Sequence, residues 1–361
     1  MNLEYTFYRG RVALTAILKA LKITSQDNVA IQAFTCLAVP EGVIASGAKP
    51  IYIDINVDNL SMCYKDLEKK INKNTKAIIL QHTFGIIGSV DEIVEVAKKY
   101  NITIIEDCCH THNSTHNNNL VGSFGSASFY SYEWGKPLVG GIGGSVETSD
   151  IELQSNLRND YDSYIYPSFF DSSRINIQYF IFKILYKPKF YWPLKKTFHL
   201  LSKLGIASGN YNGINENTIS SDFKKRMSKS IKNRIKRKLG LQKMITKKSN
   251  FITSEYKNNI TNNNFTHLKG KDNDGTVYAR YPLITDNKEA ILAEAEHENI
   301  EIAGWYNSPI HPLESMDYKH VFYEKGMCDN AEKICKKVIS LPVHYSVKIK
   351  DIERIVKFFN R

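Results

Sequence analysis

Apolar residues in the first half of the chain switch repeatedly between the spacing of a helix and the short runs of a buried strand. Helical spacing covers residues 12–21, 39–46, 64–71 and 90–100, and strand-like runs cover 28–32, 50–55, 77–80, 103–105, 126–132 and 144–148. Strands that alternate with helices predict an α/β fold, in which helices cover a mostly parallel sheet. Ligands of such sheets bind beyond the carboxyl ends of the strands, so polar side chains at those ends are candidates for a site.

This rhythm breaks after residue 157, and the chain up to residue 222 is rich in Tyr, Phe, Lys and Pro. It resumes with a strand-like run at 277–284 and helical spacing at 288–299, 330–340 and 350–359. A chain of 361 residues is long enough for two hydrophobic cores. We therefore expect a large domain over residues 1–240, with an aromatic and basic insertion at about 160–222, and a smaller α+β domain over 241–361.

Basic residues are concentrated in two segments of the chain. Lys and Arg number 48 against 37 Asp and Glu, which gives a net charge of +11. Residues 178–204 hold six Lys and residues 224–238 hold nine Lys or Arg, with no acid in either, so the remainder has 33 basic and 37 acidic residues. A local basic patch indicates a phosphate-bearing ligand or an anionic surface. Because the chain has no nucleic-acid-binding motif, the charge does not predict a nucleic-acid partner.

The aromatic and lysine side chains of residues 178–204 have two interpretations. Such a mixture suits the interface of a membrane, but it also suits an arm that wraps a second subunit and leaves its lysines in water. No run of about 20 apolar residues predicts a spanning helix, and residues 1–11 lack a signal-peptide pattern. We expect a cytoplasmic protein, with peripheral contact to the inner face of the membrane as one alternative for this segment.

Three features follow strand-like runs in the predicted sheet. Asp107 comes just after the run at 103–105, Lys136 lies after the run at 126–132, and four glycines occupy residues 140–144. Each has a simple explanation on its own: an acid that caps a helix, a solvated lysine, and a flexible hairpin. The glycines do not open a helix after a strand, so they are not a dinucleotide-binding fingerprint. Their significance therefore depends on their combination.

The combination is more specific than its parts. An acid pair, two small residues and a His occupy residues 106–110, an aromatic-Ser-aromatic run occupies 130–132, and a Gly-x-Gly-Gly turn after Lys136 closes at Gly144. This order resembles the DegT/DnrJ/EryC1/StrS family of sugar aminotransferases, which depend on pyridoxal phosphate (PLP). Further segments match in order, at residues 9–14, 34–36, 47–54, 81–85, 226–228, 280–282 and 341–342. The resemblance covers almost the whole chain, and it implies a fold-type I PLP-dependent transferase that forms a homodimer with sites at the subunit interface.

The resemblance also implies roles for residues of the large domain. Lys136 is expected to carry the cofactor covalently and then to move protons. Asp107 is expected to keep the pyridine nitrogen protonated, so that the ring can act as an electron sink. Ser131 is expected to donate a hydrogen bond to the cofactor phosphate, helped by the backbone amides of Gly10 and Arg11.

Three further cofactor contacts follow from the same resemblance. His110 stands where the family places a group near the ring hydroxyl, although a histidine satisfied within the core is the alternative. Either Cys36 or Phe34 is expected to pack on the ring face. Lys224 replaces an Asn that reaches the phosphate in the partner's site, and no metal ligand is expected.

The implied reaction moves an amino group from glutamate to a nucleotide-linked keto sugar, for amino-sugar and polysaccharide biosynthesis. Two alternatives stay open. One is another PLP reaction on a sugar nucleotide, although family members that dehydrate sugars carry His in place of Lys136. The other is a non-catalytic scaffold that binds a sugar nucleotide or a membrane. The departures from the family pattern at Arg11, Ile142 and Lys224 leave this alternative open, whereas the presence of Asp107, Ser131 and Lys136 together argues against it.

Overall fold

A seven-stranded sheet forms the centre of the protein. A computed structural model describes residues 3–203, 220–268 and 275–361. The strands lie in the order β1 (Tyr5–Phe7), β10 (Gly144–Glu147), β9 (Ala127–Ser131), β6 (Thr103–Asp107), β5 (Thr75–Gln81), β2 (Asn28–Gln32) and β4 (Lys49–Ile53). The five strands from β9 to β4 run parallel, whereas at one edge β10 pairs antiparallel with β9, and β1 pairs antiparallel with β10. The predicted mostly parallel sheet is confirmed.

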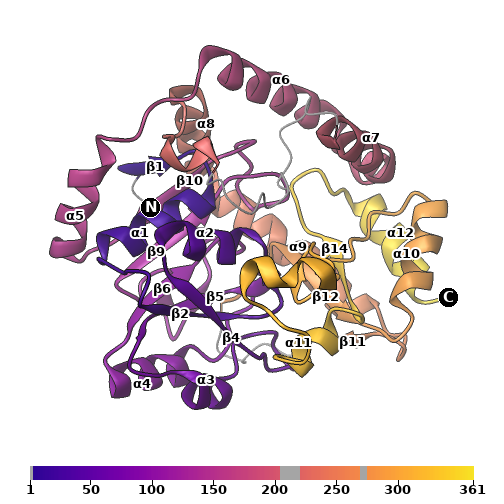
Figure 1. Cartoon of the computed structure of the whole chain (residues 1–361). Coiled ribbons are helices and arrows are strands. Elements are labelled where there is room, and N and C mark those ends of the chain that lie inside the picture. Colours follow the sequence, from indigo (N-terminus) through magenta and orange to yellow (C-terminus); the bar gives the residue numbers. More distant parts are fainter. Residues whose placement is uncertain (1–2, 204–219, 269–274) are drawn as a thin grey trace.

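Helices cover both faces of this sheet (Figure 1). They are α1 (Gly10–Ala20) and α2 (Ala38–Ser46) on one face, and α3 (Tyr64–Lys70) and α4 (Val90–Tyr100) on the other. The alternation of side chains along β2 explains the two layers, because successive residues of a strand point to opposite faces. Val29 and Ile31 join the core under α1 and α2, while Ala30 joins the core under α3 and α4.

The C-terminal part builds a second, smaller sheet. Strands β11 (Thr266–His267), β12 (Arg280–Ile284) and β14 (Val338–Pro342) are antiparallel. They share a separate core with α9 (Gln242–Asn259), α10 (Lys288–His297) and α12 (Ile349–Phe359). Helix α9 begins close to the predicted boundary at residue 240, and that domain boundary stays a prediction.

One predicted helix in this part is wrong over half its length. Instead of one helix over 330–340, the chain forms α11 (Asp329–Ile334), turns, and continues as β14. All five residues of β14 are buried. The strand pairs with β12 on one side, and Ser340 pairs with Ala303 on the other. These long-range pairings outweigh the local helical spacing, as tertiary context often does. The strand predicted at 277–284 begins only at Arg280.

The described residues between 151 and 239 are mostly helical. They form α5 (Ile151–Tyr161), α6 (Phe169–Leu185), α7 (Tyr191–Lys203) and α8 (Lys229–Leu239), with short 3₁₀ turns at Pro188–Phe190 and Ser221–Lys224. Residues 204–219 of the predicted insertion lie outside the described residues. Among the described residues, no helix is long and apolar enough to cross a membrane.

Shorter elements connect these parts. They are β3 (Thr35–Cys36), β7 (Thr115–His116), β8 (Asn119–Leu120), β13 (Ile310–His311) and the 3₁₀ turns Thr83–Gly85 and Ser315–Val321. Strand β13 pairs in parallel with β3 and so links the C-terminal part to the large sheet beside α2.

Candidate active site

The carboxyl ends of three parallel strands bring polar side chains together. Gln81 at the end of β5 stands beside Asp107 at the end of β6, which stands beside Phe129 of β9. Ser131 follows two residues later, so its side chain points to the same face as that of Phe129. The helix α1 begins next to this edge, because a Cβ on Gly10 would lie 3.0 Å from the Cβ of Ser131.

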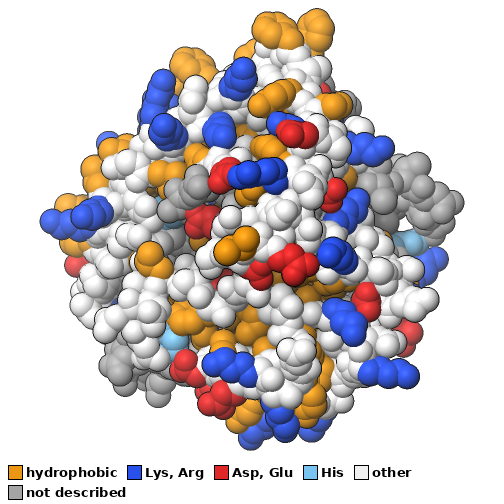
Figure 2. Space-filling view, turned by 90° about the vertical axis from the view of Figure 1, so that its left-hand side faces the viewer, with side chains coloured by type: hydrophobic (Ala, Val, Ile, Leu, Met, Phe, Trp, Pro, Cys, Tyr) orange, Lys and Arg blue, Asp and Glu red, His pale blue; other side chains and the backbone are white. Residues whose placement is uncertain are grey.

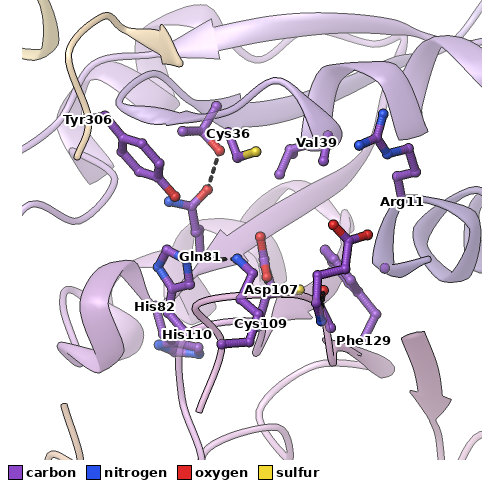
Figure 3. A pocket seen from close by; sticks show the side chains of 16 residues that line it. Arg11, Cys36, Val39, Gln81, His82, Asp107, Cys109, His110, Phe129 and Tyr306 are labelled. Atoms are coloured by element: carbon purple, nitrogen blue, oxygen red, sulfur yellow. Dashed lines mark hydrogen bonds between the residues drawn. The ribbon is translucent and has the colours of Figure 1, made fainter. Parts of the chain in front are cut away.

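A pocket opens at this edge of the sheet. Seven of the eight predicted site residues line it: Gly10, Arg11, Cys36, Asp107, His110, Ser131 and Lys136. Figure 3 shows Arg11, Val39 and Cys36 on one side of the pocket, and Asp107, Cys109 and His110 on the other. These seven residues come from four separate segments of the chain.

Lys136 is held by a histidine from the neighbouring loop. Its Nζ lies 2.8 Å from Nε2 of His110, while the backbone N–H of Phe84 donates to Nδ1 of the same ring at 3.2 Å. The ring of Tyr306 also lies against His110, with centroids 6.2 Å apart and planes 24° apart. Burial lowers the pKa of His110 well below its ordinary value, and the nearby Lys136 adds to the effect. The ring is therefore neutral.

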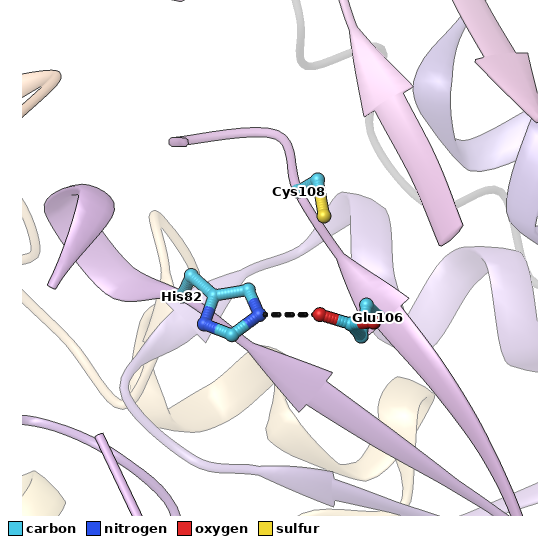
Figure 4. Close-up of side chains that lie close together, drawn as sticks. All are labelled: His82, Glu106 and Cys108. Carbon is cyan, nitrogen blue, oxygen red and sulfur yellow. Dashed lines mark hydrogen bonds and ion pairs between the residues drawn. The ribbon is translucent and has the colours of Figure 1, made fainter. Parts of the chain in front are cut away.

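The two acids of the pair have different surroundings. Glu106 is fully buried and accepts three backbone N–H groups, from Gly122 at 2.8 Å, Phe124 at 2.5 Å and Gly125 at 3.0 Å. Nε2 of His82 lies 3.1 Å from the same carboxylate (Figure 4). These contacts fix the turn before β9 to the sheet, so Glu106 is a structural acid.

Asp107 instead faces the pocket. One of its oxygens accepts the backbone N–H of Cys109 at 2.9 Å, and the side chain lines the pocket together with Lys136. A carboxylate this deeply buried is costly unless it meets a cation or further donors. The strand register thus separates the pair, because adjacent residues of β6 point to opposite faces.

His82, Glu106 and Cys108 also form a group with the composition of a metal site. Their ligand atoms lie within 4.8 Å of one another. The oxygens of Glu106, however, already accept the three backbone N–H groups and lie beside His82. We therefore interpret the group as a hydrogen-bonded network that supports the floor of the pocket.

A cradle for an anion lies on the other side of the pocket. It consists of the N-terminus of α1, whose first turn has no acidic residue, and the hydroxyl of Ser131. The Ser131 Oγ lies only 3.3 Å from the position of a Cβ on Gly10, so the glycine keeps the hydroxyl next to the helix end. The free N–H groups of a helix N-terminus favour phosphate.

Gly144 brings the helix end this close. A Cβ on Gly144 would lie 2.6 Å from the carbonyl oxygen of Arg9 and 2.7 Å from the Cα of Gly10. No side chain fits in that space, so the end of the predicted glycine turn serves a close backbone approach rather than a flexible hairpin.

Two arginines at the start of α1 are held by acids. Arg11 forms an ion pair with Glu41 of α2. Arg9 bridges Glu133 at 3.3 Å and Asp222 at 3.1 Å. Burial raises the pKa of Glu41, although Arg11 counteracts it. The Arg11 side chain is thus oriented by Glu41 at the wall of the pocket.

Of the remaining residues predicted to contact the cofactor, some line the pocket and others do not. Cys36 lines the pocket, whereas Phe34 is fully buried and packs on Tyr306 at 5.2 Å between centroids. Lys224 is exposed at the end of a 3₁₀ turn and does not line the pocket of its own chain. Its predicted role, in a partner's site, stays a prediction.

A family model matches residues 5–360 of the chain, and its description is the DegT/DnrJ/EryC1/StrS aminotransferase family. The chain belongs to this family. The resemblance seen in the sequence is therefore confirmed over nearly the whole length. The family match also gives the pocket its context, because Lys136, Asp107 and Ser131 lie together at the place that the family motifs predicted.

Curated relatives match part of the chain. A GDP-perosamine synthase of Escherichia coli O157:H7 is 37% identical over 148 residues, which is 41% of either chain. A UDP-N-acetyl-3-dehydro-alpha-D-glucosamine 3-aminotransferase of Acidithiobacillus ferrooxidans is 36% identical over 150 residues, again 41% of either chain. The chain thus spans about two fifths of the length of these relatives.

Solved structures match the fold over the whole chain. S. venezuelae DesV has a TM-score of 0.76 at 19% identity, over 99% of this chain and 83% of its own. A putative sugar aminotransferase from Streptococcus pneumoniae, solved in its PLP form, has a TM-score of 0.75 at 19% identity, over 99% and 86%. The predicted fold-type I architecture is confirmed.

Several residues of the pocket were not predicted from the sequence. Gln81 and Glu133 line it, Glu41 pairs with Arg11, and Arg9 pairs with Glu133. Tyr306, which the sequence offered as a contributor to the substrate site, also lines the pocket. The one available signal was position, since Gln81 ends a buried strand just as Asp107 does. The ion pairs join segments far apart in the chain and leave no local pattern.

Proposed function

We propose that the protein is a PLP-dependent aminotransferase that moves an amino group from glutamate to a nucleotide-linked keto sugar, for amino-sugar and polysaccharide biosynthesis. The observation that carries the proposal is the convergence of an amine, a carboxylate and an anion cradle in one pocket. Asp107 ends strand β6, Ser131 ends strand β9, and Lys136 lies in the loop that follows β9.

The residues of the pocket fit the cofactor. Lys136 would hold its carbonyl carbon, Asp107 its ring nitrogen, and Ser131 with the start of α1 its phosphate. The cradle at Gly10, which a Cβ would fill, supports this assignment. When bound, PLP supplies an electron sink that weakens the bonds at the carbon that carries the amino group.

His110 positions Lys136 for this chemistry. The backbone N–H of Phe84 donates to Nδ1 of the ring, and Nε2 of the same ring lies 2.8 Å from Nζ of Lys136. The ring thus holds Nζ inside the pocket, where a lysine amine can act as a nucleophile on a carbonyl.

The substrate class is supported by the family and by its relatives. Two of the relatives are named for amino sugars linked to GDP or UDP. We also propose a homodimer in the cytoplasm, with Lys224 near the phosphate of the partner's site.

Two experiments test the proposal. Purified protein with PLP should show a visible absorption band that Lys136→Ala abolishes, while Lys98→Ala, at an exposed position on α4, leaves it unchanged. A panel of nucleotide-linked keto sugars with glutamate should then yield an aminated product by mass. A protein that binds PLP but converts no glutamate would favour the scaffold, and a colourless protein would refute the proposal.

A further inference from the structure

Helix α6 (Phe169–Leu185) runs along the outer rim of the molecule, far from the central sheet, and α7 continues it (Figure 1). Seventeen residues make a helix about 25 Å long. Most of its surface faces solvent, since Ile175 is its one buried residue. A helix so placed normally exposes a polar face.

The inward side of α6 packs against the rest of the chain. Besides the buried Ile175, Tyr179 lies under Arg234 with 3.8 Å from the guanidinium carbon to the ring centroid. Phe182 packs on Trp134 at 4.9 Å between centroids, and the hydroxyl of Tyr186, just after the helix, donates to Glu301 at 3.0 Å. These contacts recur at helical spacing and fix which side of α6 faces outward.

The outward side is nevertheless apolar. We call the following residues the outward stripe: Phe170, Ile177, Phe180, Ile181 and Ile184, which are between 45% and 83% exposed. Phe169, at 80% exposed, begins the same surface. Figure 2 shows hydrophobic side chains gathered with Lys and Arg at the top of the molecule, on the side where Figure 1 places α6. Single exposed apolar residues are ordinary, but a continuous row of large ones marks an interaction surface.

Basic residues accompany the C-terminal half of the stripe, and Asp171, the acid in the first turn of α6, is paired with Arg174 and Lys225. Lys183, Lys187 and Lys189 are exposed at its C-terminal end. Residues 178–204 contain six Lys and no Asp or Glu. Lysines beside exposed aromatic and aliphatic side chains are typical of helices that lie in the headgroup region of an anionic bilayer.

We propose that the outward stripe of α6, with the lysines that follow it, docks the protein on an anionic lipid surface. A second copy of the chain fits less well, because residues 178–204 carry six Lys and no acid, so two copies of this surface would bring together an excess of positive charge. Lipid headgroups meet the same lysines with opposite charge. The contact sits on the rim of the molecule and does not depend on the transferase reaction.

Vesicle sedimentation with the full-length chain tests this proposal. The protein should pellet with vesicles of mixed phosphatidylserine and phosphatidylcholine, and largely stay in solution with phosphatidylcholine alone. Replacing Lys183, Lys187 and Lys189 together by Gln should weaken binding roughly a hundredfold, from the contribution of each lysine near an anionic surface. Failure of the unmodified protein to pellet with anionic vesicles would overturn the proposal.

Substitutions of exposed isoleucines distinguish docking through the stripe from nonspecific adsorption to vesicles. Ile177→Asp with Ile184→Asp should reduce binding by at least about a hundredfold, because two large side chains lose their burial. Ile151→Asp is the matched control, since Ile151 is 83% exposed on α5 at another edge of the molecule. Ile151→Asp should bind vesicles like the unmodified protein. The double variant and Ile151→Asp should both keep the thermal midpoint of the unmodified protein.

The same double variant tests whether the stripe is instead an interface with a second copy of the chain. Sedimentation velocity should show the same oligomeric state for the unmodified protein and for Ile177→Asp with Ile184→Asp. If the double variant dissociates into monomers while vesicle binding is unchanged, the stripe is a subunit interface and the lipid proposal is wrong. Neither outcome depends on whether the enzyme turns over a sugar substrate.

Discussion

Replacing Glu106 and Asp107 separately by their amides should have different effects. Glu106→Gln should lower the free energy of unfolding, and Asp107→Asn should lower the reaction rate. Glu106→Gln keeps the shape of the side chain but puts an amide nitrogen in place of one carboxylate oxygen. If that nitrogen takes the position near Gly122, the Gly122 N–H, now 2.8 Å from an acceptor, faces a donor. Asp107→Asn changes one carboxylate at the pocket wall, where its backbone contact to Cys109 is kept by the remaining oxygen.

The expected loss for Glu106→Gln follows from its contacts. One buried N–H without an acceptor costs about 1–3 kcal/mol, and the N–H groups of Phe124 and Gly125 lose a charged acceptor, at roughly 1 kcal/mol each. The free energy of unfolding should therefore fall by about 3 kcal/mol. Asp107→Asn should change it by less than about 1 kcal/mol, since its hydrogen bond to the backbone persists.

Urea unfolding and a half-reaction with glutamate measure the two effects. Glu106→Gln should unfold at lower urea but, while folded, keep the visible band and convert glutamate at close to the normal rate. Asp107→Asn should unfold normally and slow the half-reaction by about a hundredfold or more. If Asp107→Asn is the unstable variant, or Glu106→Gln the slow one, the assignment of the two acids is wrong.

Three further predictions concern the cradle, pH and a buried ion pair. Gly10→Ala should weaken PLP binding about tenfold in a titration, since its Cβ would crowd Ser131. Burial lowers the pKa of His112 to about 4. Between pH 6.5 and 4 the unfolded chain therefore binds a proton that the folded chain does not, and the urea midpoint should fall as the pH drops through this window. The midpoint of His112→Leu should fall less over the same window. Arg280→Met should cost about 3 kcal/mol in urea unfolding, because Glu301, 3.1 Å from Arg280, stays buried; adding Glu301→Gln should recover part of that loss.

The sheet and the pocket were predictable because their signals are local. β-branched runs alternate with helical spacing along residues 28–105, and each run became a strand with few shifts at its ends. Asp107 and Lys136 follow such strands, so the parallel arrangement alone brings them to one edge. The family motifs then supplied the roles that no spacing can show.

Other features depend on contacts that no local pattern records. Residues 338–342 continue the helical spacing of α11, but pairing with β12 and Ala303 makes them a strand. The ion pair of Arg11 with Glu41 joins two helices, and the sequence showed Arg11 as a departure from the family pattern without showing its partner. Helix α6 was missed because its apolar residues cover both faces and hide the helical period.

Covalent attachment of the cofactor at Lys136 is the central claim, and it can be measured directly. The purified protein is incubated with PLP, reduced with borohydride, digested and analysed by mass spectrometry. The account predicts that the peptide containing Lys136 alone gains the mass of the reduced cofactor, and that Lys136→Ala gains none. Modification of another lysine in place of Lys136, or of no lysine at all, would contradict it.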